Sequence, residues 1–204
     1  MTTPPQITKP GITAALAAAQ AGGAGSSDYD LNPGVVPPTG GLRDAAVLLT
    51  FVETGNGPHI AFTKRALHLQ NHPGQASFPG GKVDAGDASI TAAALREGWE
   101  ETALPQAGVD VLGILPPHQT VTHFQVTPVV GWVAGGLWDV QIDRGEVAEF
   151  FTAPAAHVLN PRNFRVEQRL WQGQQRRYYA VPFGPYYIWG ATARILRRLA
   201  GHMA

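Results

Sequence analysis

Residues 78–87 read Phe-Pro-Gly-Gly-Lys-Val-Asp-Ala-Gly-Asp, and residues 96–104 read Arg-Glu-Gly-Trp-Glu-Glu-Thr-Ala-Leu. The first run is a glycine-rich turn. The second lies in a helix expected from about residue 88 to residue 102, whose alanines and leucine favour helix. Asp87 or Ser89 can cap that helix, because short polar side chains accept bonds from the free N–H groups at a helix start. The stretch predicts a loop and a helix that together form one site.

Three carboxylates fall on one side of the expected helix. At 100° per residue, Glu97, Glu100 and Glu101 lie within one arc, while Leu95 and Trp99 lie on the opposite side. Like charges at this spacing destabilise a helix by roughly 0.2–0.5 kcal/mol per pair, and a bound cation would offset that cost. Because Mg²⁺ and Mn²⁺ prefer oxygen ligands, we predict a site for one of these ions, with Glu97 and Glu101 as the best pair of ligands.

The residues around the three acids bear on whether they form a site. Arg96 lies one turn before Glu100, so it can pair with that carboxylate and fix its rotamer. An Arg-Glu-x-x-Glu-Glu run alone usually marks a solvated helix face. The turn Pro79-Gly80-Gly81 favours a site instead, since glycine leaves the backbone open to a ligand.

This stretch resembles the Nudix box, the signature of hydrolases that cleave a nucleoside diphosphate linked to another moiety. The matching positions are Gly81, Arg96, Glu97, Glu100, Glu101 and Leu104. The sequence departs from the signature in three ways: eight residues rather than seven precede Arg96, the acid before them is Asp87 rather than glutamate, and Ala103 replaces a glycine. One branch of the family, the coenzyme A pyrophosphatase group, has the same eight-residue spacing.

A second segment is also similar to the coenzyme A pyrophosphatase group. Its pattern, Leu-Leu-Thr-x-Arg-Ser/Ala followed by an arginine, a glycine and Phe-Pro-Gly-Gly, matches in register at Thr63, Arg65, Ala66, Gly74 and residues 78–81. Gln70 stands where the group has arginine, which leaves the substrate preference open. Residues 146–154 and 187–193 also look like segments of the group, so the resemblance covers about residues 44–199.

The resemblance implies an α/β/α sandwich with a mixed sheet, a bound Mg²⁺ or Mn²⁺ ion, and a glutamate that deprotonates the attacking water. We predict Glu146 as that base, with Glu149 as the alternative. Arg65, Gly80 and Gly81 are predicted to contact the substrate phosphates, since an arginine at a strand end can grip a phosphate with its fork. The predicted catalytic residues are Glu146, Glu97 and Arg96, and the predicted metal ligands are Glu97, Glu100 and Glu101.

The function implied by the resemblance is hydrolysis of coenzyme A, or a coenzyme A derivative, at its pyrophosphate. The products would be 4′-phosphopantetheine, or its acyl form, and adenosine 3′,5′-bisphosphate. A Nudix hydrolase of ADP-ribose or of dinucleotides is the alternative that Gln70 keeps open. A third class, a Nudix-like domain that binds a nucleotide without cutting it, would be expected to have lost a box acid, and the helix has lost none.

Composition narrows the class further. With 204 residues and 44% hydrophobic content, we expect one hydrolase domain at residues 42–204, preceded by a partly flexible segment rich in proline, glycine and alanine at residues 1–41. Fifteen basic and fifteen acidic side chains give zero net charge, which predicts no nucleic-acid or membrane partner. The absence of cysteine excludes disulfides and thiol nucleophiles. We expect a cytoplasmic protein with a small-molecule substrate, and leave open whether it is a monomer or a homodimer.

The hydrophobic pattern predicts several strands and few helices, which is the α/β class with a mixed sheet. The expected strands are 45–53, 59–65, 109–115, 125–133, 138–142, 147–151, 165–171 and 176–181. A short helix is expected at residues 12–20 and a closing helix at residues 189–199. Lys64 and Lys82 could add charge near the substrate phosphates, but we expect them to be solvated surface cations. His68, His72, His118 and His123 are expected to be loop or core residues rather than metal ligands.

Overall fold

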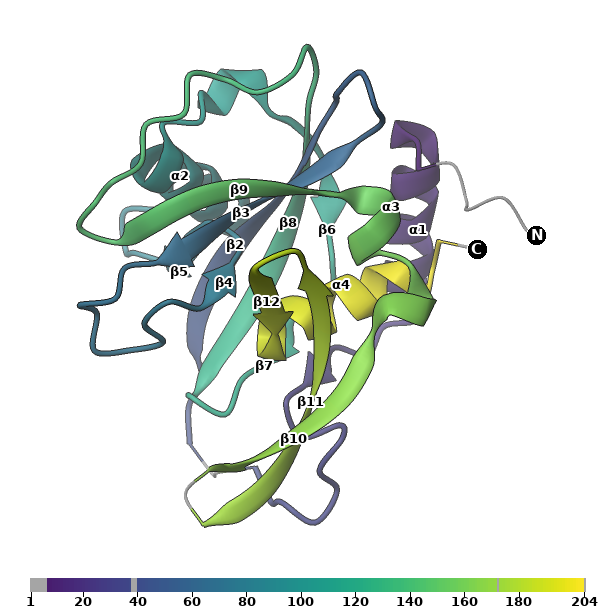
Figure 1. The fold of residues 1–204 in the computed structure, drawn as a ribbon, viewed down its shortest axis with the longest axis vertical. Helices are drawn as coiled ribbons and strands as arrows, with labels where there is room; N and C mark the ends of the chain where they lie inside the picture. The colour runs from purple at the N-terminus through teal and green to yellow at the C-terminus, as the bar shows by residue number, and fades with distance from the viewer. Residues whose placement is uncertain (1–6, 38–39, 172, 204) are drawn as a thin grey trace.

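The computed structural model describes residues 7–37, 40–171 and 173–203. A large mixed sheet forms its centre, and helices cover both faces of that sheet (Figure 1). A second, three-stranded antiparallel sheet ends in a long hairpin that extends away from the large sheet (Figure 1). Its strands are β10 (Arg165–Trp171), β11 (Gln174–Phe183) and β12 (Tyr186–Trp189).

The large sheet is built on a parallel pair, β2 (Arg43–Val52) and β8 (Phe124–Val133). β3 (His59–Arg65) returns antiparallel to β2 through a tight turn, and β9 (Val147–Pro154) lies antiparallel to β3. The shorter strands of this sheet are β1 (Ser26–Ser27), β4 (Ala76–Ser77), β5 (Gly80–Lys82), β6 (Asp110–Ile114) and β7 (His118–Gln119).

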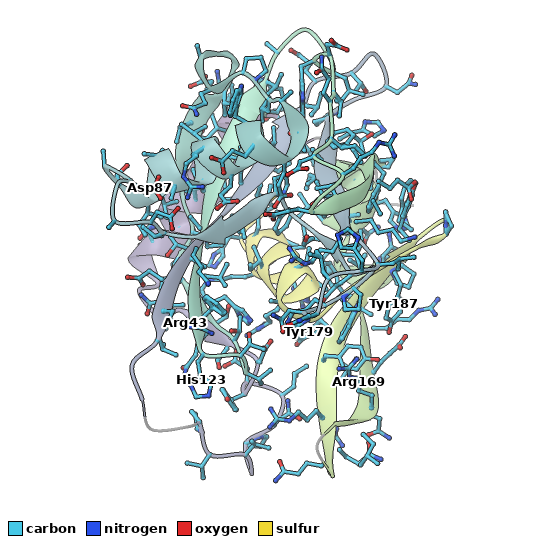
Figure 2. All side chains as sticks on the ribbon, turned by 90° about the vertical axis from the view of Figure 1, so that its left-hand side faces the viewer. Arg43, Asp87, His123, Arg169, Tyr179 and Tyr187 are labelled. Atoms are coloured by element: carbon cyan, nitrogen blue, oxygen red, sulfur yellow. The ribbon has the colours of Figure 1, made fainter. Side chains whose placement is uncertain are left out.

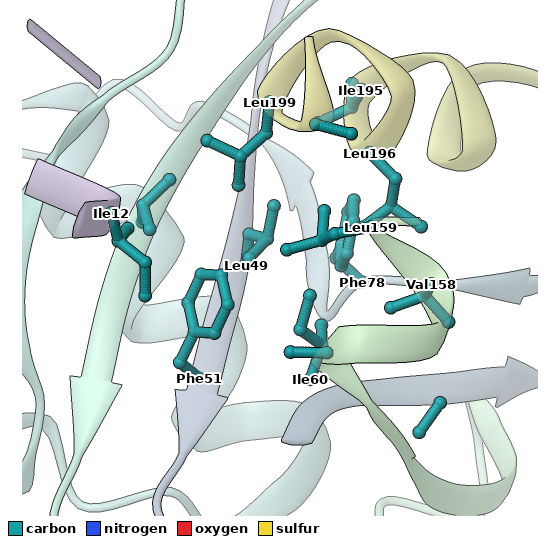
Figure 3. Packing of buried hydrophobic residues seen from close by; sticks show 14 of the residues in the cluster. Ile12, Leu49, Phe51, Ile60, Phe78, Val158, Leu159, Ile195, Leu196 and Leu199 are labelled. Atoms are coloured by element: carbon teal, nitrogen blue, oxygen red, sulfur yellow. The ribbon is translucent and has the colours of Figure 1, made fainter. Parts of the chain in front are cut away.

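Alternate side chains of β2 are buried on opposite faces of the sheet, as the period of two in a strand requires. Ala46 and Leu48 belong to a cluster that includes Ala94 of the helix on that face. Leu49 and Phe51 belong to the larger cluster on the other face, against the other helices (Figure 3). The two clusters make an α/β/α sandwich, so the predicted fold class is confirmed.

Four α-helices and two 3₁₀ turns complete the described chain. The helix predicted at residues 12–20 is present and slightly longer, and the closing helix begins directly after Trp189, which ends a strand that the sequence analysis missed. The helices are α1 (Lys9–Ala21), α2 (Ile90–Thr102), α3 (Ala155–Val158) and α4 (Gly190–Ala200), with 3₁₀ turns at Gln106–Gly108 and Pro161–Asn163.

The strand predicted at residues 138–142 is wrong, because this segment bonds to the end of α2 instead. The Trp138 indole N–H donates to the Thr102 carbonyl at 2.8 Å, and the Asp143 backbone N–H donates to the Glu101 carbonyl at 3.1 Å. The last carbonyls of a helix have no partner within the helix, so they need donors from elsewhere. The segment supplies these donors to α2, and the residues that follow lead into β9.

The segment between α1 and β2 lies against the domain where the structure describes it. The Asn32 amide donates to the Arg177 carbonyl at 2.9 Å and accepts from the Arg177 backbone N–H at 2.8 Å, which ties the segment to β11. Earlier in the same segment, Oδ1 of Asp28 lies 3.1 Å from Nε2 of His118, and the His118 side chain is fully buried. His118 is therefore a core residue, as expected from the sequence.

Candidate active site

Two glycines of β5 allow close approach, Gly80 to strand β2 and Gly81 to helix α2. β5 pairs with β2, and a Cβ atom added at Gly80 would lie 2.5 Å from the Ala46 carbonyl oxygen. A Cβ atom added at Gly81 would lie 2.5 Å from Oε1 of Glu97. Since real Cβ atoms do not come this close, only glycine lets the Glu97 carboxylate lie against the strand.

Arg96 connects the acids of α2 to the loop before it. Its guanidinium makes two bonds of 2.9 Å to Asp87 and one each to Glu97 at 2.9 Å and Glu100 at 2.8 Å. The predicted pairing with Glu100 is therefore present. These bonds raise the pKa of Arg96 and lower that of Asp87 to about 2. Because Asp87 is held by Arg96, the helix cap is the other candidate, Ser89, which accepts from the N–H of the third residue after it.

Glu101 is a buried carboxylate, with 4% of its surface exposed. It accepts a hydrogen bond from the Thr63 hydroxyl at 3.1 Å and one from the Gly80 backbone N–H at 3.2 Å. Burial raises the pKa of Glu101 to about 7, although both hydrogen bonds act to lower it. The predicted acidic arc thus runs from this buried group, past Glu97, to Glu100, whose side chain is about half exposed.

The two candidates for the catalytic base lie in different surroundings. Burial raises the pKa of Glu97, and the negative charges of Glu100 and Glu146 raise it further. The charge of Glu146 is therefore felt at Glu97. Glu146 is exposed in the loop before β9, and its backbone carbonyl accepts from Ala66 at 2.8 Å. Glu149, in contrast, accepts from the Tyr186 hydroxyl and lies 4.0 Å from the Lys64 ammonium. Glu149 is thus bonded within the fold, whereas the Glu146 side chain is exposed.

The donor set on α2 is chemically suited to a hard divalent cation, since it consists of carboxylate oxygens. Glu97 and Glu100 are turned toward Arg96, and Glu101 is turned toward β5. In this arrangement no three His, Cys, Asp or Glu side chains of the described residues converge as a ready metal site.

Arg65 ends β3, as predicted, and lies between the buried acid and the loop that follows. Its Nε–H donates to the Asn71 carbonyl at 3.4 Å. Its positive charge lowers the pKa of Glu101 and, after the larger effect of burial, also lowers the pKa of His72. The side chain therefore contacts the loop at Asn71, and its charge also acts on Glu101.

A cavity of about 680 Å³ adjoins this site and is lined by Arg65, Gly80 and Gly81. Its other walls come from the segment before β2, the β10–β11 hairpin and the start of α4. In Figure 2, Asp87 lies beside α2. Arg43, Tyr179 and Arg169 lie lower in the view and line the cavity between the large sheet and the hairpin. The sequence analysis missed this cavity, although the hairpin that it predicted is rich in arginine.

Comparisons with known proteins show the family of the chain. The model of the NUDIX domain matches residues 41–171. The chain belongs to the Nudix family. Nudix hydrolases act on phosphoric anhydrides and generally use divalent metal ions. The uncharacterized Nudix hydrolase NudL of Salmonella heidelberg is 43% identical to this Nudix chain over 171 residues, which are 83% of this chain and 88% of the relative. NudL of Salmonella newport matches to the same extent.

Solved Nudix structures are more distant from the chain. An Ap4A hydrolase binary complex of C. elegans is 18% identical, with a TM-score of 0.47 over 54% of this chain and 80% of that one. The NUDIX domain of Shewanella oneidensis NrtR, complexed with ADP ribose, is 20% identical, with a TM-score of 0.46 over 65% of this chain and 84% of that one. Likeness at this level carries no information about the substrate. Within the described residues, no helix is both long and apolar enough to span a membrane.

Proposed function

We propose that this Nudix chain hydrolyses the pyrophosphate of coenzyme A or of its derivatives. The observation that carries the proposal is the meeting of the two motif segments at one carboxylate. Gly80 of the Phe-Pro-Gly-Gly turn donates to Glu101, and the hydroxyl of Thr63, from the segment that resembles the coenzyme A pyrophosphatase group, donates to the same carboxylate at 3.1 Å. This contact supports the proposal that the two segments act as one site.

The catalytic roles follow from this placement. Glu97 and Glu101, with Glu100 as third ligand, would hold Mg²⁺ or Mn²⁺, which when bound shields the diphosphate charge and lowers the pKa of water. Arg96 orients the carboxylates of Glu97 and Glu100 through its two bonds to them. Catalysis of this kind depends on positioning and charge stabilisation rather than on a covalent step with the protein.

The remaining roles concern the water and the phosphate. Glu146, exposed and close enough to act on Glu97, accepts the proton of the attacking water. The water oxygen bonds to phosphorus, and the bridging oxygen leaves with the electron pair of the broken bond. Arg65 and the open backbone at Gly81 hold the diphosphate, the first through its guanidinium fork.

Hydrolysis of ADP-ribose or a dinucleotide is the second candidate, and one residue favours it. Gln70, which is exposed, stands where the coenzyme A pyrophosphatase group has arginine. Loss of a cation from this loop removes one attraction for a highly charged substrate.

A competition assay tests the proposal. Coenzyme A, ADP-ribose and a diadenosine polyphosphate are offered at equal concentration with Mg²⁺ or Mn²⁺, and the products are identified by mass. We expect coenzyme A to be consumed first, with release of 4′-phosphopantetheine and adenosine 3′,5′-bisphosphate. Preferential loss of ADP-ribose or of the dinucleotide would contradict the proposal and establish the second candidate.

A further inference from the structure

The cavity beside the acidic site has a strongly positive wall. Among its described lining residues, seven are Arg or Lys and one, Asp28, is a carboxylate. A net charge of zero for the whole chain makes this local excess a feature of the cavity rather than of the protein. α4 also begins at this wall, so the partial positive charge at its N-terminus adds to that of the arginines. A cavity with this charge attracts an anion.

Arg169 of the hairpin lines the cavity and is held in place by an aromatic ring. Its guanidinium lies over the ring of Trp189, 4.5 Å from the ring centre, and Tyr178 packs edge-on against that ring at 5.1 Å. Stacking of this kind restricts the guanidinium while leaving its N–H groups free to bind a ligand. The side chain is therefore preorganised for a phosphate.

A second arginine stands directly opposite Arg169. The register of β10 and β11 pairs Arg169 with Arg176, and both line the cavity. Like charges directly opposite each other destabilise an antiparallel pair. An anion bound at Arg169 would reduce this repulsion.

The hairpin arginine lies some way from the acidic site, and Arg65 and His72 connect the two. Arg65, His72 and Arg169 all line the cavity, and the Arg65 Nε–H donates to the carbonyl of Asn71, the residue before His72. Gly80, which donates to Glu101, lines the same cavity. A ligand with two separate anionic groups can contact both the acidic site and Arg169.

We propose that Arg169 binds a second phosphate of the substrate, a phosphomonoester on the nucleotide that is separate from the diphosphate being cut. This inference rests on the proposed function and deepens it, because coenzyme A carries such a group on its ribose and ADP-ribose does not. Arginine suits this role, since its planar fork binds a phosphate through two charge-assisted hydrogen bonds. Arg169 of the hairpin then supplies the positive charge that is absent at Gln70, where the coenzyme A pyrophosphatase group has arginine.

Steady-state kinetics with coenzyme A and 3′-dephospho-coenzyme A test this inference. We expect the wild-type chain to prefer coenzyme A by about tenfold or more in kcat/KM, the scale of a hydrogen bond to a charged group. Arg169→Gln should remove that preference by raising KM for coenzyme A alone. Arg165→Gln is the matched control, because Arg165 is exposed on the same strand and does not line the cavity. It should leave the preference intact.

The outcomes separate this inference from the proposed function. If coenzyme A is cut but the wild type shows no preference, or if Arg169→Gln lowers both substrates equally, the second phosphate site is wrong and the hydrolase function stands. If neither substrate is cut, the proposed function is wrong, and calorimetry of adenosine 3′,5′-bisphosphate, AMP and inorganic phosphate decides the site. The bisphosphate should bind about tenfold tighter than AMP, with the difference lost in Arg169→Gln. Equal affinity of the two nucleotides, or of inorganic phosphate and the bisphosphate, would overturn it.

Discussion

The acidic helix α2 lies beside Gly81 of β5, which lines the cavity, and the β10–β11 hairpin forms another wall of that cavity. The helix and the hairpin differ in how their charges are compensated. On α2, Arg96 bonds to Glu97 and Glu100, and Glu101 accepts two hydrogen bonds from the sheet. On the hairpin, Arg169 stacks on an aromatic ring and faces another arginine. The acids are held by hydrogen bonds and an ion pair within the protein, whereas Arg169 stacks on a ring and is the group that we propose to bind an anion. The first region suits chemistry common to Nudix hydrolases, and the second suits selection among substrates.

The largest expected effect comes from Glu97→Gln at the acidic end. Loss of one ligand charge beside the diphosphate should lower kcat by about 10³-fold or more for every diphosphate substrate, the scale seen when a main electrostatic group is removed. Circular dichroism should show an unchanged fold. Wild-type turnover in this variant would show that Glu97 is not a metal ligand. The contrast between α2 and the hairpin would then be wrong.

Glu146→Gln should have the next largest effect. Loss of a general base costs about 10²–10⁴-fold in rate, and metal-bound water needs less help from a base, so we expect a loss of about 10²-fold in kcat. Glu149→Gln is the matched control, since Glu149 is bonded to Tyr186 and lies near Lys64. Its rate should change by less than about threefold. The reverse order of losses would make Glu149 the base.

The smallest expected effect is a pH dependence of stability that Glu101 introduces. Its pKa is about 7 in the folded chain and 4.5 as an ordinary glutamate, so the folded state holds a proton that the unfolded state has lost between these values. The metal-free chain should therefore lose stability as pH rises from about 4.5 to about 7, with no further loss from this group above that range.

Thermal unfolding across this pH range, compared with Glu101→Gln, measures the effect. The difference in Tm between the two chains should grow toward pH 7 and shrink when Mn²⁺ is added, because a bound cation stabilises the ionised carboxylate. A difference that does not vary with pH would mean that Glu101 is ionised without metal. The acidic end would then carry its full negative charge before the cation binds, just as the hairpin carries its positive charge before an anion binds.

Regions whose structure depends on local pattern could be predicted from the sequence. The buried run at 45–53, its partner at 59–65 and the helix that carries the box all occur close to their expected bounds. Their periodicity reflects which side chains meet the sheet or the core. The segment at 138–142 has a similar pattern, but its N–H groups bond to carbonyls at the end of α2, a contact that no local pattern announces.

The cavity was harder to predict because its walls come from distant parts of the chain. The segment that contains Asn32, the start of α4 and the hairpin meet only in the folded structure. One signal was nevertheless present. The sequence predicts a turn at Gln172-Gly173, and counting outward from a two-residue turn there sets Arg169 opposite Arg176, which is the observed register. The turn itself includes Gln172, which lies outside the described residues.

The central claim is that the carboxylates of α2 bind a dication at the diphosphate, and crystals grown with Mn²⁺ test it most directly. An anomalous difference map should show manganese coordinated by oxygens of Glu97 and Glu101, beside the open backbone at Gly81. A map without manganese at α2, in which Glu97 still bonds to Arg96 and Glu101 to Thr63, would contradict the claim.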